Sequence, residues 1–286
     1  MKIYVVVDME GATGVVHGDE LTDAGGERYR RACGWLTSDV NAAVEGALAA
    51  GASEVVVSDG HANMRNIDLG ELHAGARLIR GPAIPSNKPL CQVADLDASY
   101  DLAFLVGFHS RAGTPGGLLS HTWVGAVVHE LRLAGQVVGE TALDAALLGE
   151  HGIPVGLVTG GDDLAREAKE THPDIEVVEV KKALGRTLAS CLPPAATAPL
   201  IREAAGRAVE RHRTTPFRPF VPGPSPLVAE VTTHRREMAA RMAEVHGLDL
   251  VDERTVRARG ERPSDVLAIV WRGLAEVMHE PATWLR

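Results

Sequence analysis

The stretch IYVVVDMEG, residues 3–11, decides the fold. Its continuous apolar run is typical of a strand that is buried on both faces, as in parallel sheets. Runs of the same kind occur at residues 54–58, 102–108 and 154–159, each ending at or near a glycine. Helical patterns separate them, the longest over residues 27–50. Strands that alternate with helices predict a three-layer α/β/α domain with a mostly parallel sheet.

The chain changes character over residues 193–226, which end in a proline-rich passage, residues 214–226. Before it, alternating segments around Ala134-Gly135 predict a hairpin over 126–138, and a helix is expected at 141–149. The other expected elements are a helix at 198–211, a strand at 227–233, a helix at 235–245, one or two short strands within 248–259 and a helix at 263–278. The β-α-β-α order after residue 226 predicts a smaller two-layer α+β C-terminal domain. We therefore expect an α/β domain over residues 1–190 and an α+β domain over residues 191–286.

Composition limits the partners. The 286 residues carry a formal charge of −9, which argues against nucleic acid and anionic membranes, because both select basic patches. No apolar stretch approaches the roughly 20 residues of a membrane helix, and the first residues lack the pattern of a signal peptide. The three cysteines, Cys33, Cys91 and Cys191, suggest no disulfide framework. We expect a cytoplasmic protein, with export by a route that the sequence does not show as the alternative.

Polar side chains follow three of the buried strands. Asp8 and Glu10 come directly after the first strand, His61 follows the second, and His109 follows the run at 102–108. Taken singly, each has an ordinary explanation as a solvated turn residue or a helix cap. Taken together they point to one crevice, because the carboxyl ends of parallel strands meet at the same edge of the sheet.

The types of these residues indicate the chemistry. Imidazole and carboxylate ligands suit zinc or a similar divalent ion, and the absence of thiolates favours a catalytic site over a structural one. Two carboxylates and two histidines exceed the three protein ligands that are usual for one catalytic zinc. The sequence therefore predicts a two-metal cluster bridged by a carboxylate, in the larger domain.

Two more residues fit this site. Glu140 begins the expected helix at 141–149, where a first-turn Glu stabilised by the helix dipole is the simpler explanation. His121 ends the glycine-rich segment 116–121, where it is either a surface residue or a general acid/base or nucleophile.

Two other features allow two interpretations each, and a third has a simple one. Asp59 either orients a histidine or makes the turn, and Asp163, in Gly-Gly-Asp-Asp (160–163), either supports the site or caps a helix over 164–171. Lys181 and Lys182 are expected to be a solvated pair after a strand at 175–180.

Several short strings together resemble one family. They are Val-Asp-Met-Glu-Gly (7–11), Asp-Gly-His (59–61), Gly-Phe-His-Ser-Arg-Ala-Gly-Thr-Pro-Gly (107–116), Ser-His (120–121) and Val-Gly-Glu (138–140). They look like those of the bacterial zinc D-aminopeptidases associated with dipeptide-transport operons. The similarity runs over most of the chain, including residues 159–163 and the C-terminal β-α-β-α order.

The resemblance implies a site of two zinc ions per chain, with Asp8 as the bridging ligand and His121 as the catalytic residue. The implied zinc ligands are Asp8, Glu10, His61, His109 and Glu140. Family members release N-terminal D-amino acids from short peptides and form rings that enclose their active sites, so a homo-oligomer, in the form of a decameric ring, is implied. This chain has Asp-Gly-His where Asp-Ser-His is common and Phe108 where Tyr is common, and neither change removes a ligand.

The leading hypothesis is thus a dinuclear-zinc aminopeptidase acting on short peptides with an N-terminal D-residue. The first alternative is a two-metal phosphoesterase, but no phosphate-cradling glycine loop with Lys and no Arg cluster supports it. The second is a non-catalytic peptide-binding protein linked to a transporter. The lack of an export signal and the five candidate metal ligands count against that class.

Overall fold

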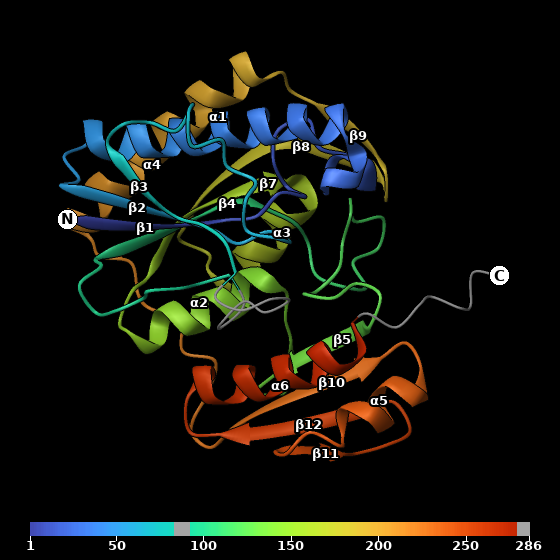
Figure 1. Cartoon of the computed structure of the whole chain (residues 1–286). Coiled ribbons are helices and arrows are strands. Elements are labelled where there is room, and N and C mark those ends of the chain that lie inside the picture. Colours follow the sequence, from blue (N-terminus) through green and yellow to red (C-terminus); the bar gives the residue numbers. More distant parts are fainter. Residues whose placement is uncertain (83–91, 279–286) are drawn as a thin grey trace.

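The computed structural model describes residues 1–82 and 92–278, so Cys91 lies outside the described ranges. A seven-stranded sheet forms the centre of the larger part of the molecule (Figure 1). Its order is β3-β2-β1-β4-β7-β8-β9, and every neighbouring pair is parallel except β8 and β9. The strands are β1 (Lys2–Val7), β2 (Glu54–Asp59), β3 (Ala76–Ile79), β4 (Leu102–Phe108), β7 (Val155–Gly161), β8 (Glu176–Gly185) and β9 (Leu188–Cys191).

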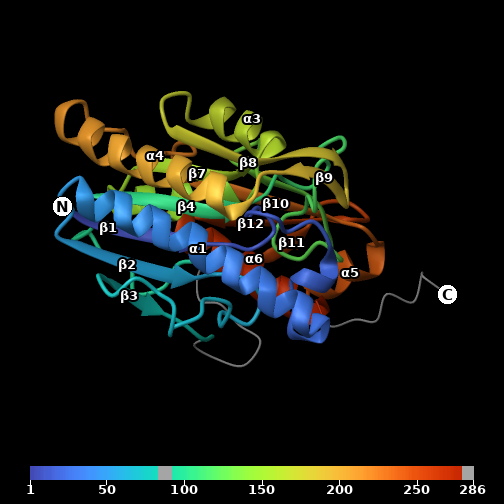
Figure 2. The same ribbon diagram turned by 90° about the horizontal axis from the view of Figure 1, so that it is seen from above.

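Helices cover both faces of this sheet (Figure 1). The pair α1 (Glu27–Ala49) and α4 (Pro194–Thr214) lies on one face, and the pair α2 (Glu140–Glu150) and α3 (Asp162–Thr171) lies on the other. Seen from above, α1 and α4 run side by side (Figure 2). Small residues allow this close packing, since a Cβ at Gly46 would lie 2.1 Å from the carbonyl oxygen of Arg202.

A second, antiparallel sheet has the order β11-β12-β10-β5-β6. Its strands are β5 (Val128–Leu133), β6 (Gln136–Val137), β10 (Leu227–Thr233), β11 (Leu248–Leu250) and β12 (Thr255–Gly260), and its helices are α5 (Arg236–Met242) and α6 (Pro263–Val277). Two short 3₁₀ helices, η1 (Gly18–Glu20) and η2 (Asp23–Gly25), precede α1. Helix α6 packs on β10 and β12 and contacts α2, so it lies between the two parts of the molecule (Figure 1). The expected fold class, a three-layer α/β/α unit with a smaller two-layer α+β unit, is confirmed.

The chain crosses between the two sheets more than once. The hairpin β5–β6 precedes residue 190 but pairs with β10 in the second sheet. Helix α4 follows residue 190 but packs on α1 of the first unit. The boundary near residue 190 remains a prediction about folding units, and elements on both sides of it contribute to the opposite unit.

Two further observations concern the described residues. None of their helices is both long enough and apolar enough to cross a bilayer. Cys33 and Cys191 carry free thiols.

Candidate metal centre

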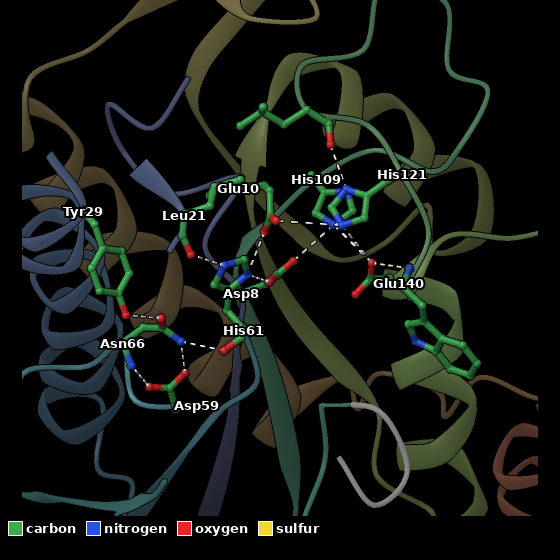
Figure 3. A network of polar contacts seen from close by, with 12 residues as sticks. Asp8, Glu10, Leu21, Tyr29, Asp59, His61, Asn66, His109, His121 and Glu140 are labelled. Carbon is green, nitrogen blue, oxygen red and sulfur yellow. Dashed lines mark hydrogen bonds and ion pairs between the residues drawn. The ribbon is translucent and has the colours of Figure 1, made fainter. Parts of the chain in front are cut away.

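The centre is assembled where β1 lies between β2 and β4. Val7 is in register with Asp59 on one side and with Val106 on the other. The chain places β2 and β3 on one side of β1 and then returns to place β4 on the other side. Such a reversal of strand order opens a crevice at the carboxyl ends of the strands. Asp8, His61 and His109 emerge at this crevice (Figure 3).

A glycine allows the segment that carries Asp8 and Glu10 to pass close to β4. The Gly11 N–H donates to the carbonyl oxygen of Gly107 at 2.8 Å. A Cβ at Gly11 would lie 1.6 Å from the carbonyl oxygen of Phe108. A side chain at this position would therefore push the two carboxylates away from His109.

His61 forms one half of the centre. Its Nε2 lies 2.9 Å from the carbonyl oxygen of Leu21, to which it donates when the proton is on Nε2. Its Nδ1 then presents a lone pair and lies 3.1 Å from Asp8 Oδ1 and 3.1 Å from Glu10 Oε2. The outer hydrogen bond thus sets the tautomer that a metal ligand needs.

His109 forms the other half in the same way. Its Nδ1 lies 3.0 Å from the carbonyl oxygen of Ser110. Its Nε2 faces Asp8 Oδ2 at 3.2 Å and Glu140 Oε1 at 3.3 Å. Asp8 therefore directs one oxygen at each histidine, and it stands between the two halves (Figure 3).

Glu140 is held in place by the backbone. It is the first residue of α2 and is buried, and its Oε1 accepts a hydrogen bond from the Trp123 N–H at 2.7 Å. Its carboxylate faces the histidines rather than capping the helix. The simpler explanation, a first-turn glutamate that only complements the helix dipole, does not account for this position.

His121 lies beside the cluster, with its ring stacked on that of His109 at a centroid distance of 4.0 Å. Its Nδ1 lies 2.8 Å from the carbonyl oxygen of Leu119, so the lone pair is on Nε2. That Nε2 is 3.8 Å from both Glu10 Oε1 and Glu140 Oε1. Leu119 (φ 52°) and Trp123 (φ 57°), two residues to either side, have left-handed backbones, a strain that often marks functional loops.

The donor set fits divalent metal ions. Asp8 Oδ2, Glu10 Oε2 and His109 Nε2 are buried and face the opposite charges of the cluster at 3.1–3.2 Å, but none of them forms a hydrogen bond of good geometry. Such an arrangement is costly unless a cation or proton completes the site. The ligand atoms of Asp8, Glu10 and His109 lie within 4.8 Å of one another, as do those of His109, His121 and Glu140. Imidazole nitrogen and carboxylate oxygen are the ligands that zinc takes in catalytic sites.

The electrostatics of these side chains agree with a cation site. Burial alone would lower the pKa of His61, but the charges and hydrogen bonds of Glu10 and Asp8 raise it to about 10. Burial would also lower the pKa of His109, but hydrogen bonds and charge from Asp8 and Glu140 hold that pKa well above its usual range. Burial would raise the pKa of Asp8, but the two histidines keep it well below its usual range. Without metal, protons on the imidazoles compensate the carboxylates.

Asp59 and Asp163 support the centre without facing it. The Asp59 carboxylate accepts hydrogen bonds from the backbone of Asn66 and Ile67 and from the Asn66 amide, which also donates to the carbonyl oxygen of His61. Asp59 thus builds the loop after His61 and does not orient its ring.

Asp163 Oδ2 accepts from Ser110 Oγ at 2.7 Å and from the Leu118 N–H at 2.9 Å. It fixes both ends of the loop between His109 and His121.

Lys181 corrects an expectation, because it is buried and not part of a solvated pair. Its Nζ donates to the carbonyl oxygens of Glu10 at 2.6 Å, Ala12 at 2.8 Å and Val15 at 2.5 Å. Burial lowers its pKa to about 8, although Asp39 and Glu10 are among the acidic groups that oppose this. The sequence contains no signal for this role, since the three acceptors are backbone atoms about 170 positions earlier.

A cavity of about 670 Å³ opens over the centre. Asp8, Glu10, His61, His121 and Glu140 form its floor, and Trp123 of the first unit and Trp271 of α6 line it as well. Its volume is in the range of small-molecule sites. Residues from both units therefore enclose the crevice.

A parallel α/β sheet with a buried carboxylate–histidine cluster at its carboxyl edge is the arrangement of a metal-dependent enzyme. Residues 1–271 match the family model Peptidase_M55, described as D-aminopeptidase, and the chain belongs to this family. A D-aminopeptidase of Bacillus subtilis (strain 168) is 34% identical over 229 residues, 80% of each chain. The solved structure of Zn-dependent D-aminopeptidase DppA from Bacillus subtilis, a self-compartmentalizing protease, has a TM-score of 0.91 and 29% identity, covering 98% of this chain and 99% of that one.

Proposed function

We propose that the protein is a dinuclear-zinc aminopeptidase that removes an N-terminal D-amino acid from short peptides. The observation that carries the proposal is the placement of Asp8 between His61 Nδ1 and His109 Nε2. In this arrangement Asp8, Glu10 and His61 would hold one ion, and Asp8, His109 and Glu140 would hold the other. Membership of the D-aminopeptidase family and the similarity to a Zn-dependent enzyme support the choice of metal and substrate.

A divalent ion held by these residues would supply Lewis acidity at the peptide carbonyl. The protein's own contribution is to fix the ligands through second hydrogen bonds, to Leu21 from His61 and to Ser110 from His109. His121 Nε2 is the basic atom next to the cluster that is not needed as a ligand in this scheme. We assign it the catalytic role, either transferring a proton to or from the reacting groups or attacking the carbonyl, since both use the same lone pair.

The assembly is also part of the proposal. Because the DppA relative is a self-compartmentalizing protease, we propose that this chain forms a homo-oligomer, in the form of a decameric ring, that encloses the cavities. Short peptides would reach such a chamber more readily than folded proteins.

Metal content and stereospecificity test the proposal together. The purified protein should contain about two zinc ions per chain and should release alanine from D-Ala-D-Ala but not from L-Ala-L-Ala, in a chelator-sensitive way. Native mass measurement of the same preparation should give a multiple of the 30.3 kDa chain. Hydrolysis of the L-peptide alone would overturn the stereochemistry. A protein that binds no zinc, manganese or cobalt and stays inactive with them would overturn the proposal as a whole.

A further inference from the structure

The charges lining the cavity are unequally distributed. Asp8, Glu10 and Glu140 gather at the metal centre, whereas Arg65 is the one lysine or arginine among the described residues that line the cavity. Arg65 is exposed. Its guanidinium forms no ion pair or hydrogen bond with any residue in the described ranges 1–82 and 92–278.

The loop that carries Arg65 is rigidly built. Two residues that precede it, Ala62 (φ 44°) and Met64 (φ 56°), have left-handed backbones that are uncommon for residues other than glycine. The Met64 N–H donates to the carbonyl oxygen of His61 at 2.7 Å, and the Gly81 N–H donates to that of Met64 at 2.6 Å. The Asn63 side chain accepts a hydrogen bond from the Arg65 N–H at 3.0 Å.

This loop is also tied to the metal centre. It begins at His61, and it is closed at Asn66 by hydrogen bonds to Asp59 and to the carbonyl oxygen of His61. Strained backbone that is held this firmly is typical of ligand-contacting segments. The base of the Arg65 side chain is thus fixed relative to a candidate metal ligand four positions earlier.

We propose that Arg65 binds the C-terminal carboxylate of the substrate and so restricts the enzyme to short peptides with a free acid end. The inference rests on the proposed function, because the scissile bond must lie at the metal centre. A guanidinium matches a carboxylate with two parallel hydrogen bonds, which a lysine does not reproduce. An extended peptide gains at most about 3.6 Å per residue, so a carboxylate bound in the same cavity as the reacting carbonyl belongs to a peptide of few residues.

The test compares the acid and amide forms of one peptide. Equilibrium binding and kcat/KM are measured with D-Ala-D-Ala and its C-terminal carboxamide, for the zinc-loaded wild type and for Arg65→Met and Arg65→Lys. The wild type should prefer the acid by about tenfold or more in both measurements. Arg65→Met should bring this ratio close to one, and Arg65→Lys should give an intermediate ratio. Zinc content, measured for every variant, shows whether the centre is intact.

Arg272→Met is the matched control, because Arg272 is an exposed arginine next to the cavity-lining Trp271 but does not line the cavity itself. It should keep the wild-type ratio. A wild type without preference for the acid, or an Arg65→Met variant that keeps the preference, overturns the inference. If the acid binds in preference through Arg65 but is not cleaved, Arg65 still binds the carboxylate and the proposed function fails. If neither peptide binds, both fail.

Discussion

At the scale of single residues, the distances separate His121 from the other two histidines. His61 and His109 approach their carboxylates at 3.1–3.3 Å, whereas His121 Nε2 remains 3.8 Å from Glu10 and Glu140. The His121 side chain is also 22% exposed, against 9% and 1% for His61 and His109. A partly exposed imidazole at this distance suits a group that acts on the substrate better than one that holds an ion.

His121→Ala should therefore reduce kcat by at least about 10²-fold, the usual loss on removing an acid–base group, while both zinc ions stay bound. Metal analysis and steady-state hydrolysis of D-Ala-D-Ala measure the two effects. His246→Ala, which removes an exposed histidine of the second unit, is the control and should change neither. Loss of zinc from His121→Ala would show instead that His121 is a ligand, as its proximity to His109 and Glu140 also allows.

At the scale of elements, β8 holds the segment after β1 through a single ammonium group. Lys181→Met keeps the apolar stem but leaves the carbonyl oxygens of Glu10, Ala12 and Val15 without this donor. We expect the variant to lower the free energy of unfolding by about 2 kcal/mol and to weaken zinc binding, because the Glu10 backbone loses its anchor. Urea denaturation and a zinc titration measure these effects.

Lys182→Met is the matched control, since Lys182 is the exposed neighbour on the same strand. It should leave stability and zinc affinity close to those of the wild type. Equal effects of the two substitutions would show that the three hydrogen bonds of Lys181 do not position Glu10.

The strands were predictable because their apolar runs are continuous, and β1, β2 and β4 appear within a residue or two of their expected bounds. The convergence of Asp8, His61 and His109 followed from parallel strands sharing an edge. The position of Lys181 did not follow, because the pairing of β7 with β8 shifts register between Gly160 and Gly161, and Val180 and Lys181 are both buried. The edge strands β3 and β9 were missed, since they are short and largely exposed or half-buried.

At the scale of the whole molecule, the buried cluster links stability to pH and to metal. In the metal-free protein the pKa of His61 is raised from 6.5 to about 10 by the surrounding carboxylates, which outweigh the effect of burial. A raised pKa contributes stability that is complete below about pH 6.5 and is lost as pH rises towards 10. Bound zinc replaces these protons, so its stabilising effect should increase with pH over the same interval.

The difference in Tm between zinc-loaded and chelator-treated protein should therefore grow by several degrees from pH 6.5 to pH 9. Taking the difference in Tm cancels the pH-dependent stability contributed by groups away from the cluster. One such group is Asp39, whose pKa is raised by burial to about 6. Thermal unfolding followed by circular dichroism at a series of pH values measures it. A difference that is constant with pH would mean that zinc does not displace protons from the imidazoles.

The assignment of elements to the two units was less predictable from the sequence than the fold class. The expected boundary near residue 190 placed the hairpin before Glu140 in the first domain, but the hairpin pairs with β10, about 100 positions later in the chain. Trp271 of α6 was not predicted to line the cavity either, because α6 is far in sequence from the strands that carry the centre. Local patterns of apolar residues predict helices and strands well. They do not predict which strands pair when these lie far apart in the sequence.

The β5–β6 hairpin lies in the first half of the chain but pairs in the second sheet, and this has a consequence for synthesis on the ribosome. Strand β5 ends at Leu133, but its partner β10 begins at Leu227, so the hairpin is translated well before the sheet that receives it. During that interval one edge of β5 has no strand to pair with, and exposed strand edges invite association with other chains. A nascent chain that stops before β10 also lacks the sheet that anchors the hairpin leading to Glu140. Completion of the candidate metal centre therefore waits until β10 has been translated.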